Sequence, residues 1–236
     1  MLTSFPPSST ALVVGATGGI GAAFVAALQA SERFATVHEA GRSAPIRIDY
    51  DDPATFAAID DLGPLDLVIV ATGLLHEGDP GSEAGAGPEK SMRALDALWM
   101  ERNYRVNTVG PMLVARHALP LMRREAKSVF AALSARVGSI SDNRLGGWHS
   151  YRMAKAALNM GLKNLAIEHA RRWPNGIVCG LHPGTVDTDL SEPFQRGVKR
   201  LFTPQEAAGK LLAVIDGLTP KDTGGVFDHA GERIPS

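Results

Sequence analysis

The stretch Ala11-Leu-Val-Val-Gly-Ala-Thr-Gly-Gly-Ile-Gly21 decides the fold of this chain. An apolar run leads directly into glycines spaced G-x3-G-x-G, and the small, Ala-rich residues from Gly19 to Ala30 have the pattern of a packed helix. A strand, a glycine turn and a helix start form an anion site, because backbone N–H groups point outward and the helix dipole favours negative charge. The stretch therefore predicts a pyrophosphate site. A tight strand-to-helix turn without a ligand is the alternative.

Each glycine of this stretch has an expected role. Gly15 permits the tight turn, Gly19 lets the backbone approach the phosphates, and Gly21 permits close packing of the helix on the strand.

Strand-like and helix-like patterns alternate along the rest of the chain. Strands are expected at 35–40, 45–49, 65–71, 128–133, 177–181 and 226–227. Helices are expected after Asp52-Pro53, over 91–124 and 150–171, and from the capping box Thr203-Pro-Gln-Glu206 to Gly217. Short apolar strands separated by helices indicate a parallel sheet covered on both faces. We predict an α/β fold, a doubly wound sheet in a three-layer αβα sandwich, with residues 1–236 in a single domain.

Composition excludes several classes of partner. Lys and Arg number 24 against 25 Asp and Glu, so no polycation is present and no nucleic acid is expected. The single cysteine, Cys179, excludes an internal disulfide and fits a reducing compartment. The seven histidines show no paired ligand spacing, so no metal is expected. Residues 1–10 have no leader pattern, and no apolar run approaches the ~20 residues of a membrane span. We expect a cytoplasmic protein without a membrane partner.

Two irregular segments stand out. The segment 76–90 carries four glycines and two prolines, and it is interpreted equally well as a functional rim or as disorder. The segment 191–200 contains Pro193 and Phe194, and a mobile substrate flap and an ordinary surface helix are equal alternatives there.

A second motif, Tyr151-Arg-Met-Ala-Lys155, places a phenol and an ammonium on one helix face. A phenol has a pKa of about 10, so it needs a nearby cation to act as an acid or base near neutral pH. Alone, Tyr-x3-Lys is a weak signal. Together with the glycine turn, it makes the whole chain resemble the short-chain dehydrogenase/reductase family.

Within that family the sequence is most similar to the branch of sniffer-type carbonyl reductases and bacterial C-factor proteins. The narrower likeness is carried by Gly138-Ser-Ile140, Gly146-Gly-Trp148, the residues from Tyr151 to Leu158, and Leu181-His-Pro-Gly-Thr-Val-Asp-Thr188.

The resemblance implies a Rossmann fold and a role for each matching residue. Tyr151 would be the general acid that protonates a carbonyl oxygen, and Lys155 would lower its pKa and bind the nicotinamide ribose. Asn107 would be the family's helix asparagine. The implied cofactor-binding residues are Gly15, Thr17, Gly19, Ile20, Gly21, Arg42, Asp49, Tyr50, Ala71, Gly73, Tyr151, Lys155, Pro183, Gly184, Val186 and Thr188. For Asp49 a strand-end cap, and for Pro183-Gly184 a simple turn, are the structural alternatives.

The chain departs from the family pattern in two places. The family's Asn-Asn-Ala-Gly appears here as Val70-Ala-Thr-Gly73. Ala135 stands where the catalytic serine is expected, three residues before Gly138. Ser134 is favoured as its replacement, with Ser139 close behind, and a site without a serine is the third alternative. Ser139 and Trp148 are expected near the substrate, although plain packing of Trp148 is about as good an interpretation.

The expected cofactor is NADP(H), with a moderate preference over NAD(H). An NAD site needs a carboxylate at the end of the second strand, whereas this strand ends Ala40-Gly-Arg42. The planar guanidinium of Arg42 can hold a 2′-phosphate. Because side chains alternate along a strand, Glu39 should point away from the group that Arg42 binds. The resemblance also implies that NADP-specific members often carry a second basic residue where this chain has Gly18, so the preference is only moderate.

Asn107 is also expected to act through its backbone. Pro111 lies four residues later and has no N–H, so the Asn107 carbonyl loses its usual helical partner and could hold a water that relays protons. A proline kink without a catalytic role is the alternative.

The sequence thus predicts an NADP(H)-dependent reductase of an aldehyde or ketone. A dinucleotide-binding signalling or regulatory protein with little turnover is the alternative. The partner is a small carbonyl compound of unspecified identity, and the resemblance is compatible with a homodimer or homotetramer.

Overall fold

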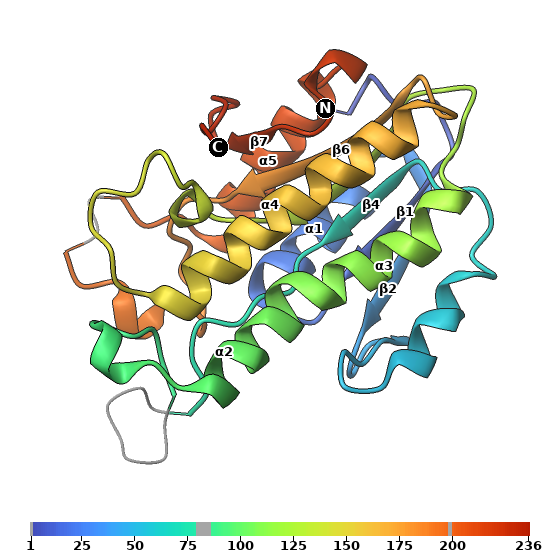
Figure 1. Cartoon of the computed structure of the whole chain (residues 1–236). Coiled ribbons are helices and arrows are strands. Elements are labelled where there is room, and N and C mark those ends of the chain that lie inside the picture. The colour runs from blue at the N-terminus through green and yellow to red at the C-terminus, as the bar shows by residue number, and fades with distance from the viewer. Residues whose placement is uncertain (1, 79–85, 198–199) are drawn as a thin grey trace.

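Seven parallel strands form one sheet in the order β3-β2-β1-β4-β5-β6-β7 (Figure 1). The structure, a computed structural model, describes residues 2–78, 86–197 and 200–236. The strands are β1 (Ser9–Val14), β2 (Phe34–Gly41), β3 (Ile46–Arg47), β4 (Leu67–Val70), β5 (Ser128–Leu133), β6 (Gly176–His182) and β7 (Val226–Asp228). From β1 the chain first adds β2 and β3 on one side, and then returns to add β4 to β7 on the other side. The boundary between β1 and β4 is the point at which open α/β sheets form their binding crevice.

The two faces of the sheet are covered by different helices. On β1, Ala11 and Val13 face a core that contains α1 (Gly19–Gln29) and α5 (Pro204–Gly217). Leu12 and Val14 face the opposite core, beneath α3 (Gly110–Ala118) and α4 (His149–Ala170). Figure 1 shows α3 and α4 in front of the sheet and α1 and α5 behind it. The predicted doubly wound α/β sandwich is therefore confirmed.

The helix expected over 91–124 is only partly correct. An α-helix, α2 (Ala97–Tyr104), begins late because Asp96 caps it by accepting the Trp99 N–H at 2.8 Å. A π-helical turn over Arg105–Val109 then connects α2 to α3. Within that turn the Gly110 N–H donates to the Arg105 carbonyl, five residues back. The turn stands immediately before Pro111, which cannot donate a helical hydrogen bond. The segment after Ala118 is 3-10 helix only, over Leu119–Leu121.

The other expected elements agree with the structure to within a few residues. The helix predicted after Asp52-Pro53 is a 3-10 helix over Pro53–Ile59, capped by the Asp52 carboxylate. Both hydrogen bonds of the predicted capping box at the start of α5 are present. Cys179 is buried in β6, as the apolar pattern predicted. Among the described helices, none combines the length and apolarity that crossing a bilayer requires.

Candidate active site

A cavity of about 600 Å³ opens at the carboxyl ends of β1, β4 and β5. Fourteen predicted site residues line it: Gly15, Thr17, Gly19, Ile20, Arg42, Asp49, Tyr50, Ala71, Gly73, Ser134, Tyr151, Lys155, Pro183 and Thr188. Six others are not among its described lining residues: Gly21, Asn107, Ser139, Trp148, Gly184 and Val186. The structure thus brings together the glycine turn, which precedes α1, and the Tyr-x3-Lys pair of α4.

The glycine turn has the geometry expected of an anion site. Gly15 has φ +87°, a left-handed conformation that glycine adopts without strain. A Cβ on Gly21 would lie 2.0 Å from the Gly15 carbonyl oxygen, so a side chain there would prevent α1 from packing on the turn. Gly18, Gly19 and Ile20 line the cavity at the start of α1, which has no acidic residue in its first turn. The positive end of the helix dipole therefore faces the cavity, and the first turn of α1 itself supplies no carboxylate to compete with an anion.

Tyr151 and Lys155 share the face of α4 that borders the cavity. Lys155 is 2% exposed, its Nζ donates to the Leu133 carbonyl at 2.8 Å, and it lies 5.7 Å from the centroid of the Tyr151 ring. Burial lowers the pKa of Lys155 to about 7. Burial also raises the pKa of Tyr151, opposite to the direction expected from a neighbouring cation. The phenol is therefore protonated at neutral pH, the state that a general acid requires.

The two candidate serines have different surroundings. Ser134 lines the cavity, and its Oγ donates to Asn159 Oδ1 at 2.6 Å. Ser139 is buried, and its Oγ accepts the Asp142 N–H at 3.1 Å. Ser134 therefore lies on the cavity wall, and Ser139 is not among the described lining residues. The Ser134 hydroxyl nevertheless directs its proton at Asn159 of α4.

Asn107 braces two segments of the chain rather than facing the cavity. Its side chain is fully buried, donates to the Leu74 carbonyl at 2.8 Å and accepts the Leu74 N–H at 3.1 Å. Its amide nitrogen also contacts Asn103 Oδ1 at 3.2 Å. The side chain thus fixes the turn after β4 to the π-helical segment.

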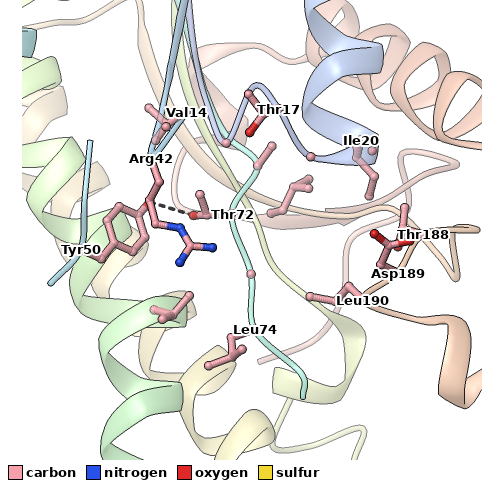
Figure 2. Close-up of a pocket in the computed structure, with 18 of the residues that line it drawn as sticks. Val14, Thr17, Ile20, Arg42, Tyr50, Thr72, Leu74, Thr188, Asp189 and Leu190 are labelled. Atoms are coloured by element: carbon pink, nitrogen blue, oxygen red, sulfur yellow. Dashed lines mark hydrogen bonds between the residues drawn. The ribbon is translucent and has the colours of Figure 1, made fainter. Parts of the chain in front are cut away.

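One wall of the cavity contains Arg42, Tyr50 and Thr72. Figure 2 shows these residues opposite Thr188 and Leu190. The Tyr50 hydroxyl and the Thr72 hydroxyl are 2.8 Å apart. Glu39 is absent from the described lining of the cavity, as strand alternation predicted.

The predicted loop after β6 divides into two parts. Pro183 and Thr188 line the cavity. Gly184 and Val186 instead contact Phe202, so they shape the loop from behind.

Aromatic rings gather beside Tyr151. Trp148 makes an edge contact with the Tyr151 ring at a centroid distance of 6.4 Å, and another with Phe194 at 5.4 Å. Phe194 in turn contacts His76 at 5.9 Å. The segment 191–200 therefore contains a 3-10 helix, Glu192–Phe194, packed against Trp148 and His76. Residues 79–85 and 198–199, parts of the two irregular segments considered above, lie outside the described residues.

Sequence reasoning missed an ionic group on the cavity rim. Arg102 of α2 donates to Asp51 at 2.8 Å and to Glu77 at 2.8 Å, and all three residues line the cavity. No local pattern signals this group, because its members come from three separate segments.

The family of the chain follows from comparison with known sequences. The model described as short chain dehydrogenase matches residues 49–199. C-signal from Myxococcus xanthus is 34% identical over 174 residues, which cover 73% of this chain and 93% of that protein. The chain therefore belongs to the short-chain dehydrogenase family, a family of oxidoreductases, as the sequence motifs predicted. A further relative is 1-hydroxy-2-glutathionyl-2-methyl-3-butene dehydrogenase from Rhodococcus sp. (strain AD45), 39% identical over 58% of each chain.

Solved structures share the fold over nearly the whole chain. The NADPH-bound carbonyl reductase from chicken fatty liver has a TM-score of 0.82 at 23% identity, covering 99% of this chain and 96% of that one. The carbonyl reductase Sniffer of D. melanogaster also has a TM-score of 0.82, at 19% identity, covering 97% and 99%. At these identities the likeness establishes the architecture.

Proposed function

We propose that the protein is an NADP(H)-dependent oxidoreductase that reduces a small aldehyde or ketone. The observation that carries this proposal is the placement of Tyr151 and Lys155 in the same cavity as the glycine turn. Phosphate binding alone needs no phenol beside a buried lysine. The carbonyl reductase names of the structural relatives add support.

The lining residues fit a dinucleotide. A Cβ on Gly19 would lie 2.8 Å from Thr188 Cγ2, so glycine at this position keeps open the passage between the turn and the loop after β6. Arg42, which is exposed, is suited to a 2′-phosphate through its planar fork. When bound, NADPH supplies the hydride for carbonyl reduction.

The chain's own residues supply the proton and the positioning. Tyr151 holds its proton on Oη and donates it to the carbonyl oxygen. Lys155, held by the Leu133 carbonyl, places a positive charge beside the phenolate that results. Ser134 is the candidate to polarise the carbonyl, which requires its hydroxyl to turn from Asn159 towards the substrate.

A second candidate is a dinucleotide-binding signalling protein with negligible turnover. Two observations favour it: Ala135 occupies the position of the family's serine, and C-signal is among the relatives. Intact Tyr151 and Lys155 argue for the enzyme, because a binding protein needs no proton donor.

Tyr151→Phe separates the two candidates, since it removes the proton donor and keeps the ring that packs on Trp148. A panel of aldehydes and ketones is assayed by loss of NADPH absorbance, and NADPH affinity is measured separately. Turnover should fall by about two to four orders of magnitude while the NADPH dissociation constant changes little. Should the biological effect survive Tyr151→Phe and disappear with a Gly19 substitution that abolishes NADPH binding, the signalling function is the correct one.

We also propose that the protein is a homo-oligomer. Met153, Met160 and Ile167 are spaced seven residues apart on α4 and are 55%, 63% and 50% exposed. An apolar stripe of this kind is typical of a helix that packs against another subunit. Light scattering of the wild type and of Met160→Lys tests this, because a charge in the stripe should shift the oligomer to monomers.

A further inference from the structure

The catalytic helix α4 begins without a local cap. Its N-cap residue, Trp148, has φ +51° and makes no side-chain hydrogen bond to the helix, and the first turn contains no acidic residue. Backbone N–H groups in a first turn have no helical partner, and they need a capping oxygen if the turn is not to fray. Tyr151 lies in that first turn, so the position of its hydroxyl depends on how the turn is held.

Glu89 supplies the missing cap from 61 positions away along the chain. Its carboxylate accepts the Ser150 N–H, at 3.1 Å from Oε2 and 3.3 Å from Oε1. The Ser150 hydroxyl donates to the same carboxylate. The Glu89 backbone carbonyl accepts the Trp148 N–H at 2.5 Å. Glu89 therefore bonds to both Trp148 and Ser150, and Ser150 immediately precedes Tyr151.

The Glu89 carboxylate is 4% exposed and makes no ion pair within the described parts of the chain. Burial of a carboxylate without a cation is costly unless hydrogen bonds compensate for it. Within residues 2–78, 86–197 and 200–236, the hydrogen bonds of this carboxylate all end on Ser150. The negative charge also lies at the positive end of the α4 dipole, which favours it there.

We propose that Glu89 is a positioning residue for Tyr151: it fixes the first turn of α4, and with it the angle at which the phenol and the Trp148 ring meet. This rests on the proposed function, in which Tyr151 donates the proton. Glu89 is not among the described residues that line the cavity, so its effect passes through Ser150 and Trp148. A small displacement of a proton donor lowers the rate of the chemical step much more than it lowers cofactor affinity.

The test compares three variants of the full chain. Glu89→Ala removes the acceptor, whereas Glu89→Gln keeps an oxygen at the same reach. Asp66→Asn is the control for loss of stability, because Asp66 is also a buried carboxylate at the opposite end of the sheet. Asp66 accepts the Thr10 N–H at 2.8 Å and forms an ion pair with Arg123. Measurements are kcat, KM, the NADPH dissociation constant, the melting temperature, and hydrogen exchange of residues 149–153 and 158–166.

For Glu89→Ala we expect kcat to fall roughly tenfold to a hundredfold, with KM and the NADPH dissociation constant within about twofold. Exchange should accelerate in residues 149–153 and stay unchanged in 158–166. Glu89→Gln should recover most of the lost kcat. Asp66→Asn should lower the melting temperature while leaving kcat and the exchange of residues 149–153 unchanged.

Unchanged exchange in residues 149–153 of Glu89→Ala would overturn the proposal. A loss of kcat in Asp66→Asn equal to that in Glu89→Ala would also overturn it, since any loss of stability would then suffice. If the wild type turns over none of the carbonyl panel, the proposed function fails, and the exchange measurement alone decides whether Glu89 holds the turn.

Discussion

Lys155 is tied to the end of β5 by Leu133: its Nζ donates to the Leu133 carbonyl at 2.8 Å. The bond anchors the second turn of α4 to the strand that borders the cavity, and it holds an amine that is 2% exposed. Desolvation disfavours the charged form, so the pKa of Lys155 falls from 10.5 to about 7. Lys155 thus fixes α4 against β5, and the burial of its charged form lowers the stability of the folded protein.

The first prediction concerns the stability of Lys155→Met without cofactor. Between pH 7 and pH 10.5 the unfolded wild type binds a proton on Lys155 that the folded protein does not, so wild-type stability from this group rises with pH. Below pH 7 the full cost of burying the charge is present, of order 5 kcal/mol, offset by about 1–3 kcal/mol for the bond to Leu133. Lys155→Met should therefore gain stability relative to wild type at pH 6, and the gain should shrink towards pH 9. Thermal melts across that range measure it, and a difference that grows with pH would contradict it.

Alanine substitutions of Ser134 and Ser139 should have different effects on the turnover rate. Ser134→Ala should lower turnover on the order of a hundredfold, because a hydroxyl directed at a developing oxyanion contributes that much. Ser139→Ala should instead cost about 1 kcal/mol of stability, since its buried hydroxyl accepts the Asp142 N–H. Steady-state rates and melting temperatures of both variants decide the matter. If Ser139→Ala is the slow variant, the two assignments exchange, and two near-normal rates would mean that the reaction does without a serine.

Arg42→Ala should weaken NADPH binding much more than NADH binding. An ionic hydrogen bond to a 2′-phosphate contributes about 1.5–3 kcal/mol, which corresponds to a roughly tenfold to hundredfold change in the NADPH dissociation constant. The NADH constant should change by less than about threefold, because NADH lacks the phosphate. Fluorescence titration with both cofactors gives the two constants. Equal weakening of both would remove the basis for an NADP(H) preference.

Asn107→Ala should destabilise the protein strongly. The variant leaves the N–H and the carbonyl of Leu74 without their side-chain partner at a buried position, at about 1–3 kcal/mol for each group. Urea unfolding should show a loss of about 2–5 kcal/mol. Asn107→Asp should lose at least as much, because its buried carboxylate would face the Leu74 carbonyl and Asn103 Oδ1 without an N–H to donate to either. An unfolding free energy close to wild type for Asn107→Ala would show that this bracing contributes little. The expectation that the Asn107 carbonyl holds a proton-relay water stays a prediction.

Sequence alone determined the features whose cause is local. Short, almost wholly apolar runs specified the strands, and helical patterns with their caps specified the helices. The glycine spacing specified the turn before α1, and the i, i+4 spacing placed Tyr151 and Lys155 on one face. Even the capping box of α5 was predictable, because Thr203 and Glu206 are three residues apart. Each of these depends on contacts between near neighbours in the chain.

The tertiary structure alone decided the features whose partners are distant in sequence. Asn107 bonds to Leu74, Ser134 points at Asn159, and Glu89 caps a helix that begins sixty residues later. The helix predicted over 91–124 is shorter at both ends, since α2 begins at Ala97 after the Asp96 cap and α3 ends at Ala118. The apolar pattern also does not reveal the π-helical turn that joins α2 to α3 before Pro111. A buried polar group must find a hydrogen-bond partner, and the identity of that partner follows from which strands and helices the sheet order brings together.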